Sequence, residues 1–139
     1  MKKLLTLILI AATLFCFATN TFAALPETIA PMWVNIRQMS NDLVFNGTSG
    51  IADTMVFGKS GTTRITGTLT VYVQTSNGWE EVDSTSGSST SLYLSMTINF
   101  TGIPGEYYKS VLNVTVTING VNESETKTAY EYCPITTAN

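Results

Sequence analysis

The chain has 139 residues, 7 basic and 10 acidic side chains, no histidine and two cysteines, with a formal net charge of −3. The lack of histidine excludes Ser-His-Asp and Cys-His catalysis and histidine zinc sites. An acidic chain does not offer the positive patch that phosphate contacts require, so we expect no nucleic-acid partner.

Residues 1–23 have the pattern of a helical signal peptide. Lys2 and Lys3 precede an apolar run from Leu4 to about Ala18, and Ala23 supplies a small residue at the expected cleavage position. The run is shorter than the about 20 apolar residues that cross a bilayer, so we expect cleavage rather than stable membrane insertion. A lipid anchor at Cys16 is disfavoured because bulky Phe15 precedes it. The predicted location is extracellular.

Cleavage leaves 116 residues, which we divide into a domain over 24–133 and a flexible tail over 134–139. Without Lys2 and Lys3, five basic side chains remain against ten acidic ones, a formal charge of −5. Cys133 is then the single cysteine. We expect either an intermolecular disulfide that links two copies, or a monomer with the thiol packed as a small hydrophobe.

Apolar and polar residues alternate with period two through most of the mature chain, and no helical period appears after residue 23. This pattern, interrupted by turn residues, predicts strands over 33–39, 42–47, 50–58, 63–74, 79–84, 92–100, 107–118 and 123–133. The segment 84–91 is rich in serine and is predicted to be a flexible connection. Turns are expected at Asn77-Gly78 and at Asn119-Gly120.

The alternation also predicts which side chains face the core. In 63–74 these are Ile65, Leu69, Val71 and Val73, with Gly67 on the same face to permit close packing. The other inward sets are Leu92, Leu94, Met96, Ile98 and Phe100, and Tyr108, Leu112, Val114, Val116 and Ile118. In 50–58, Ile51, Met55 and Phe57 share one face, which Asp53 interrupts. Seven or eight such strands predict an all-β fold, an antiparallel immunoglobulin-like β-sandwich.

A Gly-x-Tyr precedes the long strand 107–118. In sandwiches a tyrosine at this place often turns its hydroxyl back onto a neighbouring loop, and Tyr107 or Tyr108 is the candidate.

The stretches NIRQMSNDLVFNGTSGIAD, LTVYVQTSNGWEEVDS and GEYYKSVLNVTVTING resemble a family of small secreted proteins from Gram-positive bacteria. Its members carry a signal peptide followed by one β-sandwich domain of unknown function. The resemblance implies a fold and a location, and it brings no catalytic or binding residues.

Carboxylates are the remaining candidates for catalysis. Glu81 and Asp83 are predicted to share one face of a strand while Glu80 points away. A glycosidase needs two carboxyls across a cleft, and calcium needs six or more oxygens, so we favour a solvated strand edge. We expect no catalytic residue, no metal and no cofactor.

Charges also alternate along the last strand, where Glu123, Glu125, Glu131 and Lys127 share a parity. They form either a patch for a cation or basic partner, or a charged edge that opposes aggregation; we favour the edge.

Tyr72, Trp79 and Tyr93 are the candidate ligand-facing aromatics, since rings on a sheet face can stack on sugars. The structural alternative is that Trp79 covers its own hairpin and the tyrosines form cross-strand pairs. We expect a non-catalytic extracellular module for a protein or surface partner. A carbohydrate-binding module for cell-wall or environmental glycans is the second hypothesis, and an unrecognised enzyme is the third.

Overall fold

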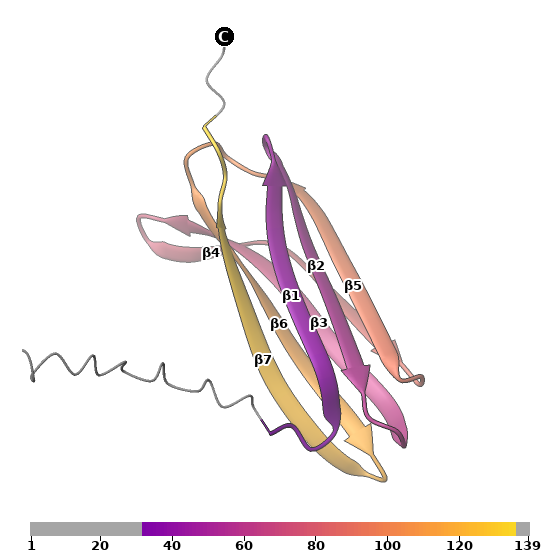
Figure 1. Ribbon diagram of the computed structural model, residues 1–139. Helices are drawn as coiled ribbons and strands as arrows, with labels where there is room; N and C mark the ends of the chain where they lie inside the picture. Colours follow the sequence, from indigo (N-terminus) through magenta and orange to yellow (C-terminus); the bar gives the residue numbers. More distant parts are fainter. Residues whose placement is uncertain (1–31, 136–139) are drawn as a thin grey trace, which may run out of the picture. The chain divides into compact units, whose positions relative to one another are not determined.

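The computed structural model describes residues 32–135, and every regular element in that range is a β-strand (Figure 1). The seven strands are β1 (Ile36–Asn46), β2 (Ser49–Gly58), β3 (Thr62–Thr75), β4 (Gly78–Ser89), β5 (Tyr93–Thr101), β6 (Tyr107–Ile118) and β7 (Val121–Tyr132). The predicted signal peptide and most of the predicted tail lie outside the described residues.

The strands form two antiparallel sheets, ordered β1-β2-β5 and β4-β3-β6-β7, so the predicted β-sandwich is confirmed. The two sheets pack face to face (Figure 1). In the seven-stranded immunoglobulin constant arrangement the fourth strand joins the sheet of the first, second and fifth. Here β4 instead pairs with β3, which widens the second sheet to four strands.

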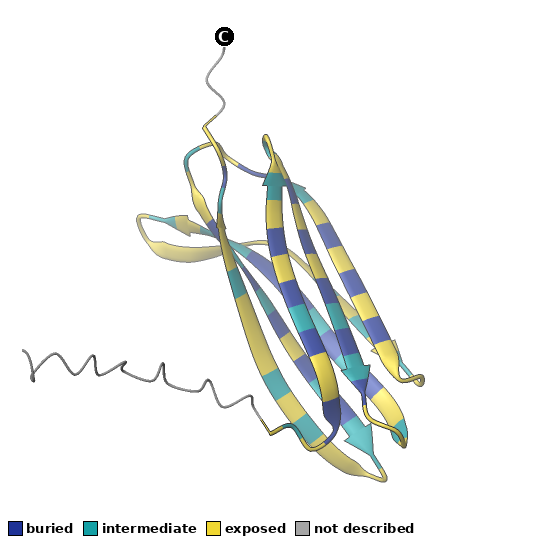
Figure 2. Ribbon diagram, viewed as in Figure 1, coloured by how far each residue is buried: buried dark blue, intermediate teal, exposed yellow. Residues whose placement is uncertain are grey.

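Period-two alternation places one face of each sheet in a shared core, visible as alternating buried and exposed bands in Figure 2. The inward residues predicted for β3, β5 and β6 are largely confirmed, since Ile65, Leu94 and Leu112 and most of their predicted companions are buried. Val73, Phe100 and Ile118 are only partly buried, and Leu92, which precedes β5, is 49% exposed. At Gly67 an added Cβ would lie 2.8 Å from Met96 Cε, so the predicted close packing is present.

The first strand differs from the prediction. The segments 33–39 and 42–47 were predicted as two strands, but they form one continuous strand, β1. The intervening polar residues do not turn the chain, because Asn41 points into the sandwich and is 4% exposed. Its side-chain amide donates to the Ser110 carbonyl on β6 and accepts a hydrogen bond from the Ser110 hydroxyl. These hydrogen bonds allow a polar residue to occupy an inward position.

Ile51, Met55 and Phe57 share one face of β2 as predicted, and this face points away from the core. Ala52, Thr54 and Val56 are buried, whereas Ile51 is exposed and Met55 and Phe57 are only partly buried. Asp53 shares the outward parity and accepts a hydrogen bond from Thr97 Oγ1 at 2.6 Å. Burying that carboxylate would cost more than leaving the apolar side chains partly exposed. Thr54 is tolerated inside because its hydroxyl donates to the Met96 carbonyl at 3.2 Å.

The serine-rich segment is also ordered differently from the prediction. Residues 84–89, predicted as a flexible connection, continue β4. Hydroxyl pairs join this segment to β3, with Thr68 and Ser86 2.9 Å apart and Thr70 and Ser84 3.0 Å apart. Such cross-strand hydroxyl contacts stabilise a strand that buries little apolar area.

The predicted tyrosine contact is confirmed for Tyr108. Its ring is buried, and its hydroxyl accepts a hydrogen bond from the Ile103 backbone N–H at 2.8 Å. Phe45 and Phe100 pack against the same ring. This contact fixes the β5–β6 loop to the core.

Candidate ligand-binding face

Two of the three predicted aromatics meet on the outer face of the four-stranded sheet. The Lys109 ammonium lies 5.0 Å from the ring centre of Tyr72 and 4.5 Å from that of Trp79. Lys109 lies directly opposite Tyr72 in the β3–β6 pairing, and its chain neighbours Tyr108 and Ser110 are buried. The lysine charge is therefore held by two rings through cation–π contacts.

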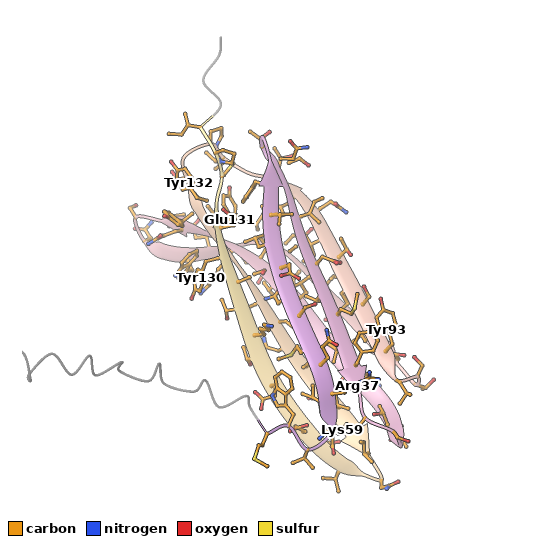
Figure 3. All side chains as sticks on the ribbon, viewed as in Figure 1. Arg37, Lys59, Tyr93, Tyr130, Glu131 and Tyr132 are labelled. Carbon is orange, nitrogen blue, oxygen red and sulfur yellow. The ribbon has the colours of Figure 1, made fainter. Side chains whose placement is uncertain are left out.

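Three further tyrosines, which the sequence analysis missed, complete an aromatic cluster. Tyr130 and Tyr132 project from β7, and Tyr107 projects from β6 (Figure 3 labels the two on β7). The Tyr107 and Tyr132 rings are 5.1 Å apart, and Trp79 and Tyr130 are 6.1 Å apart. We define the aromatic cluster as Tyr72, Trp79, Tyr107, Tyr130 and Tyr132 around Lys109.

Trp79 reaches Tyr130 although β4 and β7 are the two opposite edges of their sheet. A bulge in β4 explains this. Asp83 lies opposite Val71 and Glu81 lies opposite Tyr72, which leaves Val82 without a partner in β3. Bulges bend a strand and increase its twist, so the hairpin tip swings across the face (Figure 1). The turn residues are Ser76 and Asn77, one position before the prediction, and Gly78 follows at φ 116°.

Tyr93 does not belong to this cluster. It lies at the start of β5 in the other sheet, opposite Phe57, with the two ring centres 5.1 Å apart. Figure 3 shows it at the end of the sandwich away from Tyr130 and Tyr132. Its side chain is 41% exposed, and it lies outside the candidate face.

A polar groove of about 890 Å³ occupies the other half of the same sheet face. Seven of its lining residues carry hydroxyls and come from all four strands: Thr66, Thr68, Ser86, Ser88, Thr115, Ser124 and Thr126. Arg64 is a charged lining residue with the outward parity of Thr66, whereas the other one, Glu125, lies opposite buried Val114. Several hydroxyls already pair across strands, as Thr115 with Ser124 at 2.7 Å, which holds them in fixed positions.

The carboxylates of β4 do not form a pair on one face. Cross-strand partners share a face, so the bulge puts Asp83 on the side of buried Val71 and Glu81 on the side of Tyr72. The prediction that they share a face is therefore wrong. Glu80 accepts a hydrogen bond from Thr75 Oγ1 at 3.0 Å, within its own hairpin.

Charged residues of β7 connect the last strand to the first. The Glu123 carboxylate accepts hydrogen bonds from the backbone N–H groups of Val34, Asn35 and Ile36 at 2.6 to 2.8 Å. Lys127 Nζ donates to the Met39 carbonyl at 2.9 Å. Burial raises the pKa of Glu123, but the three N–H donors and the positive charge of Lys59 lower it by more. Glu123 and Lys127 therefore connect β7 to β1 and the residues just before it, a contact we call the β1–β7 seam. They do not face outward as a patch.

Cys133 is fully buried directly after β7. Backbone hydrogen bonds join it to Gly105 and Glu106, and its burial raises the pKa of the thiol. In this conformation the thiol packs as a small hydrophobe, and a disulfide to a second copy would require the segment to open.

No family model matches the chain, and no curated protein matches it. Among solved structures, the crystal structure of Spo0M, a sporulation control protein from Bacillus subtilis, is similar to this chain at 12% identity and a TM-score of 0.38. The match covers 70% of this chain and 49% of that one, so this chain spans about half the length of Spo0M. A similarity of that size carries no argument about function.

Over residues 32–135, no helix is long and apolar enough to span a membrane, and no three acidic or cysteine side chains gather as metal ligands.

Proposed function

We propose that this chain is a secreted, non-catalytic interaction module of a Gram-positive bacterium, which binds an extracellular protein or surface partner. Residues 1–23 support secretion because they have the composition of a cleavable signal. The bacterial source rests on the family resemblance described above.

The observation that carries the proposal is the aromatic cluster. Tyr130 is 62% exposed, Tyr107 52% and Trp79 37%, although all three belong to one patch of one sheet. Tryptophan and tyrosine are the side chains that most often anchor binding interfaces, because they offer large rigid surfaces with a polar tip. Trp79 is held by its cation–π contact with Lys109, Tyr130 packs against Trp79, and Tyr107 packs against Tyr132, so these rings are positioned before any ligand arrives.

A second candidate is a carbohydrate-binding module. The groove beside the cluster favours it, because most of its lining side chains carry hydroxyl or amide groups that can form hydrogen bonds.

Retention of the purified secreted protein on intact cells of its host tests the binding role. Tyr130→Ala should reduce retention about tenfold, since loss of an anchor residue costs more than about 1.4 kcal/mol. Tyr93→Ala is the matched control, because it removes an exposed tyrosine from the other sheet and should leave retention unchanged. Equal retention of both variants, or none of the wild type, would refute the proposed face.

A further inference from the structure

The ligand of the binding face follows from the chemistry of the groove and the rings, provided that this face binds a partner as proposed above. We infer that the outer face of β4-β3-β6-β7 binds a neutral polysaccharide chain, which lies along the strands from the polar groove to the aromatic cluster. The groove and the cluster lie on the same side of β3, where Thr66 and Thr68 line the groove, Tyr72 belongs to the cluster, and Thr70 between them is 6% exposed. At about 3.3 Å per residue, Thr66 to Tyr72 spans about 20 Å, which suits an oligosaccharide better than a single sugar.

The chemistry of the groove selects a neutral, hydroxyl-rich ligand. Arg64 has the outward parity of Thr66 and brings one positive charge to the groove, whereas Glu125 lies opposite buried Val114 and has the inward parity. The remaining polar groups are hydroxyls and the Asn113 amide, which both donate and accept hydrogen bonds. A polyanion would require several cations here, and a protein partner would require apolar pockets for its anchors. Sugar hydroxyls also donate and accept hydrogen bonds, so they are suited to these groups.

The aromatic cluster supplies the complementary contact. Pyranose rings expose C–H groups on their faces, and these pack on the faces of tyrosine and tryptophan. Lys109 is engaged by Tyr72 and Trp79, so its charge is already partnered and does not demand an anionic ligand. The polar groove and the exposed rings therefore provide hydrogen bonding and stacking on the same side of one sheet.

The test separates a glycan from a protein as the bound component. Host cells are treated beforehand with protease, which removes surface proteins, or with periodate, which cleaves the vicinal diols of sugars. The purified protein is then added, and retention is measured at low and high salt. We expect retention to survive protease, to fall at least about tenfold after periodate, and to change little with salt, since no ion pairs are formed.

A groove variant tests the hydroxyl half of the face independently of the rings. Thr68→Val together with Ser86→Ala removes both members of one hydroxyl pair, so neither partner is left unsatisfied and the fold should be retained. This variant and Tyr130→Ala should each weaken binding to periodate-sensitive sites about tenfold, while Tyr93→Ala binds as the wild type does.

Retention that protease abolishes and periodate spares would overturn the glycan inference and leave the proposed binding module standing. Full retention by the groove variant would also overturn it, since the ligand would then contact only the rings. Absence of any retention on untreated cells would remove both the glycan inference and the proposed function.

Discussion

Truncating the buried Asn41 to alanine should lower the free energy of unfolding more than the same change at an exposed asparagine does. Asn41 Nδ2 donates to the Ser110 carbonyl at 3.0 Å and to the Lys127 carbonyl at 2.8 Å. Its Oδ1 accepts a hydrogen bond from Ser110 Oγ at 2.9 Å. These hydrogen bonds connect β1 of one sheet to β6 and β7 of the other. The side chains of Asn41 and Ser110 are both buried.

The magnitude follows from the three hydrogen bonds. Each contributes about 1 kcal/mol net, and the Ser110 hydroxyl left without its acceptor adds a penalty of about 1–3 kcal/mol. Asn41→Ala should therefore lower the free energy of unfolding by about 4–6 kcal/mol. That is a large part of the about 5–15 kcal/mol that holds an ordinary domain folded.

Urea unfolding followed by tryptophan fluorescence measures this difference. Asn113→Ala is the control, because Asn113 is exposed and its amide oxygen accepts a single bond from Thr126. That change should stay within about 0.5 kcal/mol. In an Asn41→Ala background, Ser110→Ala should cost less than it does alone, since the shared bond is already lost. A cost below about 1 kcal/mol for Asn41→Ala, or additive costs in the double variant, would refute the reasoning.

Three further predictions concern the seam, the tyrosine contact and the thiol. The pKa of Glu123 is lowered in the folded chain, so its carboxylate stabilises the fold above the unfolded pKa of about 4.3, and that contribution disappears as the pH falls through the folded pKa. The difference in urea midpoint between wild type and Glu123→Gln should thus be constant near neutral pH and shrink below about pH 4; a difference that ignores pH would contradict the assignment. Tyr108→Phe leaves the Ile103 N–H without its acceptor and should cost about 1–2 kcal/mol in the same urea assay, whereas Tyr107→Phe, at an exposed position, should cost almost nothing; equal costs would argue against the contact. Cys133 should react with a disulfide reagent at least about tenfold more slowly in the folded protein than in urea, because its thiol is buried and its pKa is raised; equal rates would mean that the end of the domain does not pack as described.

The sequence predicted strand faces well where the alternation was unbroken and poorly where a polar residue lay inside. In β6, Leu112, Val114 and Val116 alternate with polar side chains, and all three are buried. In β2, Asp53 and Thr54 compete for the inner face, and Thr54 turns inward because burying the Asp53 carboxylate would cost more and because the Thr54 hydroxyl finds an acceptor in the Met96 carbonyl. That acceptor lies 42 residues away, so no local pattern could reveal it.

Part of the aromatic cluster could be predicted from the sequence, because a two-residue turn fixes the pairing of the strands that follow and precede it. The Asn119-Gly120 turn, with φ of 51° and 78°, places Ile118 opposite Val121. Counting back along both strands from that pair puts Lys109 opposite Tyr130 and Tyr107 opposite Tyr132. A two-residue turn therefore fixes half of the cluster by register alone. The β3–β4 half is different, because the unpaired Val82 breaks the count and carries Trp79 across the sheet to Tyr130. Nothing local to the sequence marks that bulge, so the contact that closes the candidate face could be found only in the folded chain.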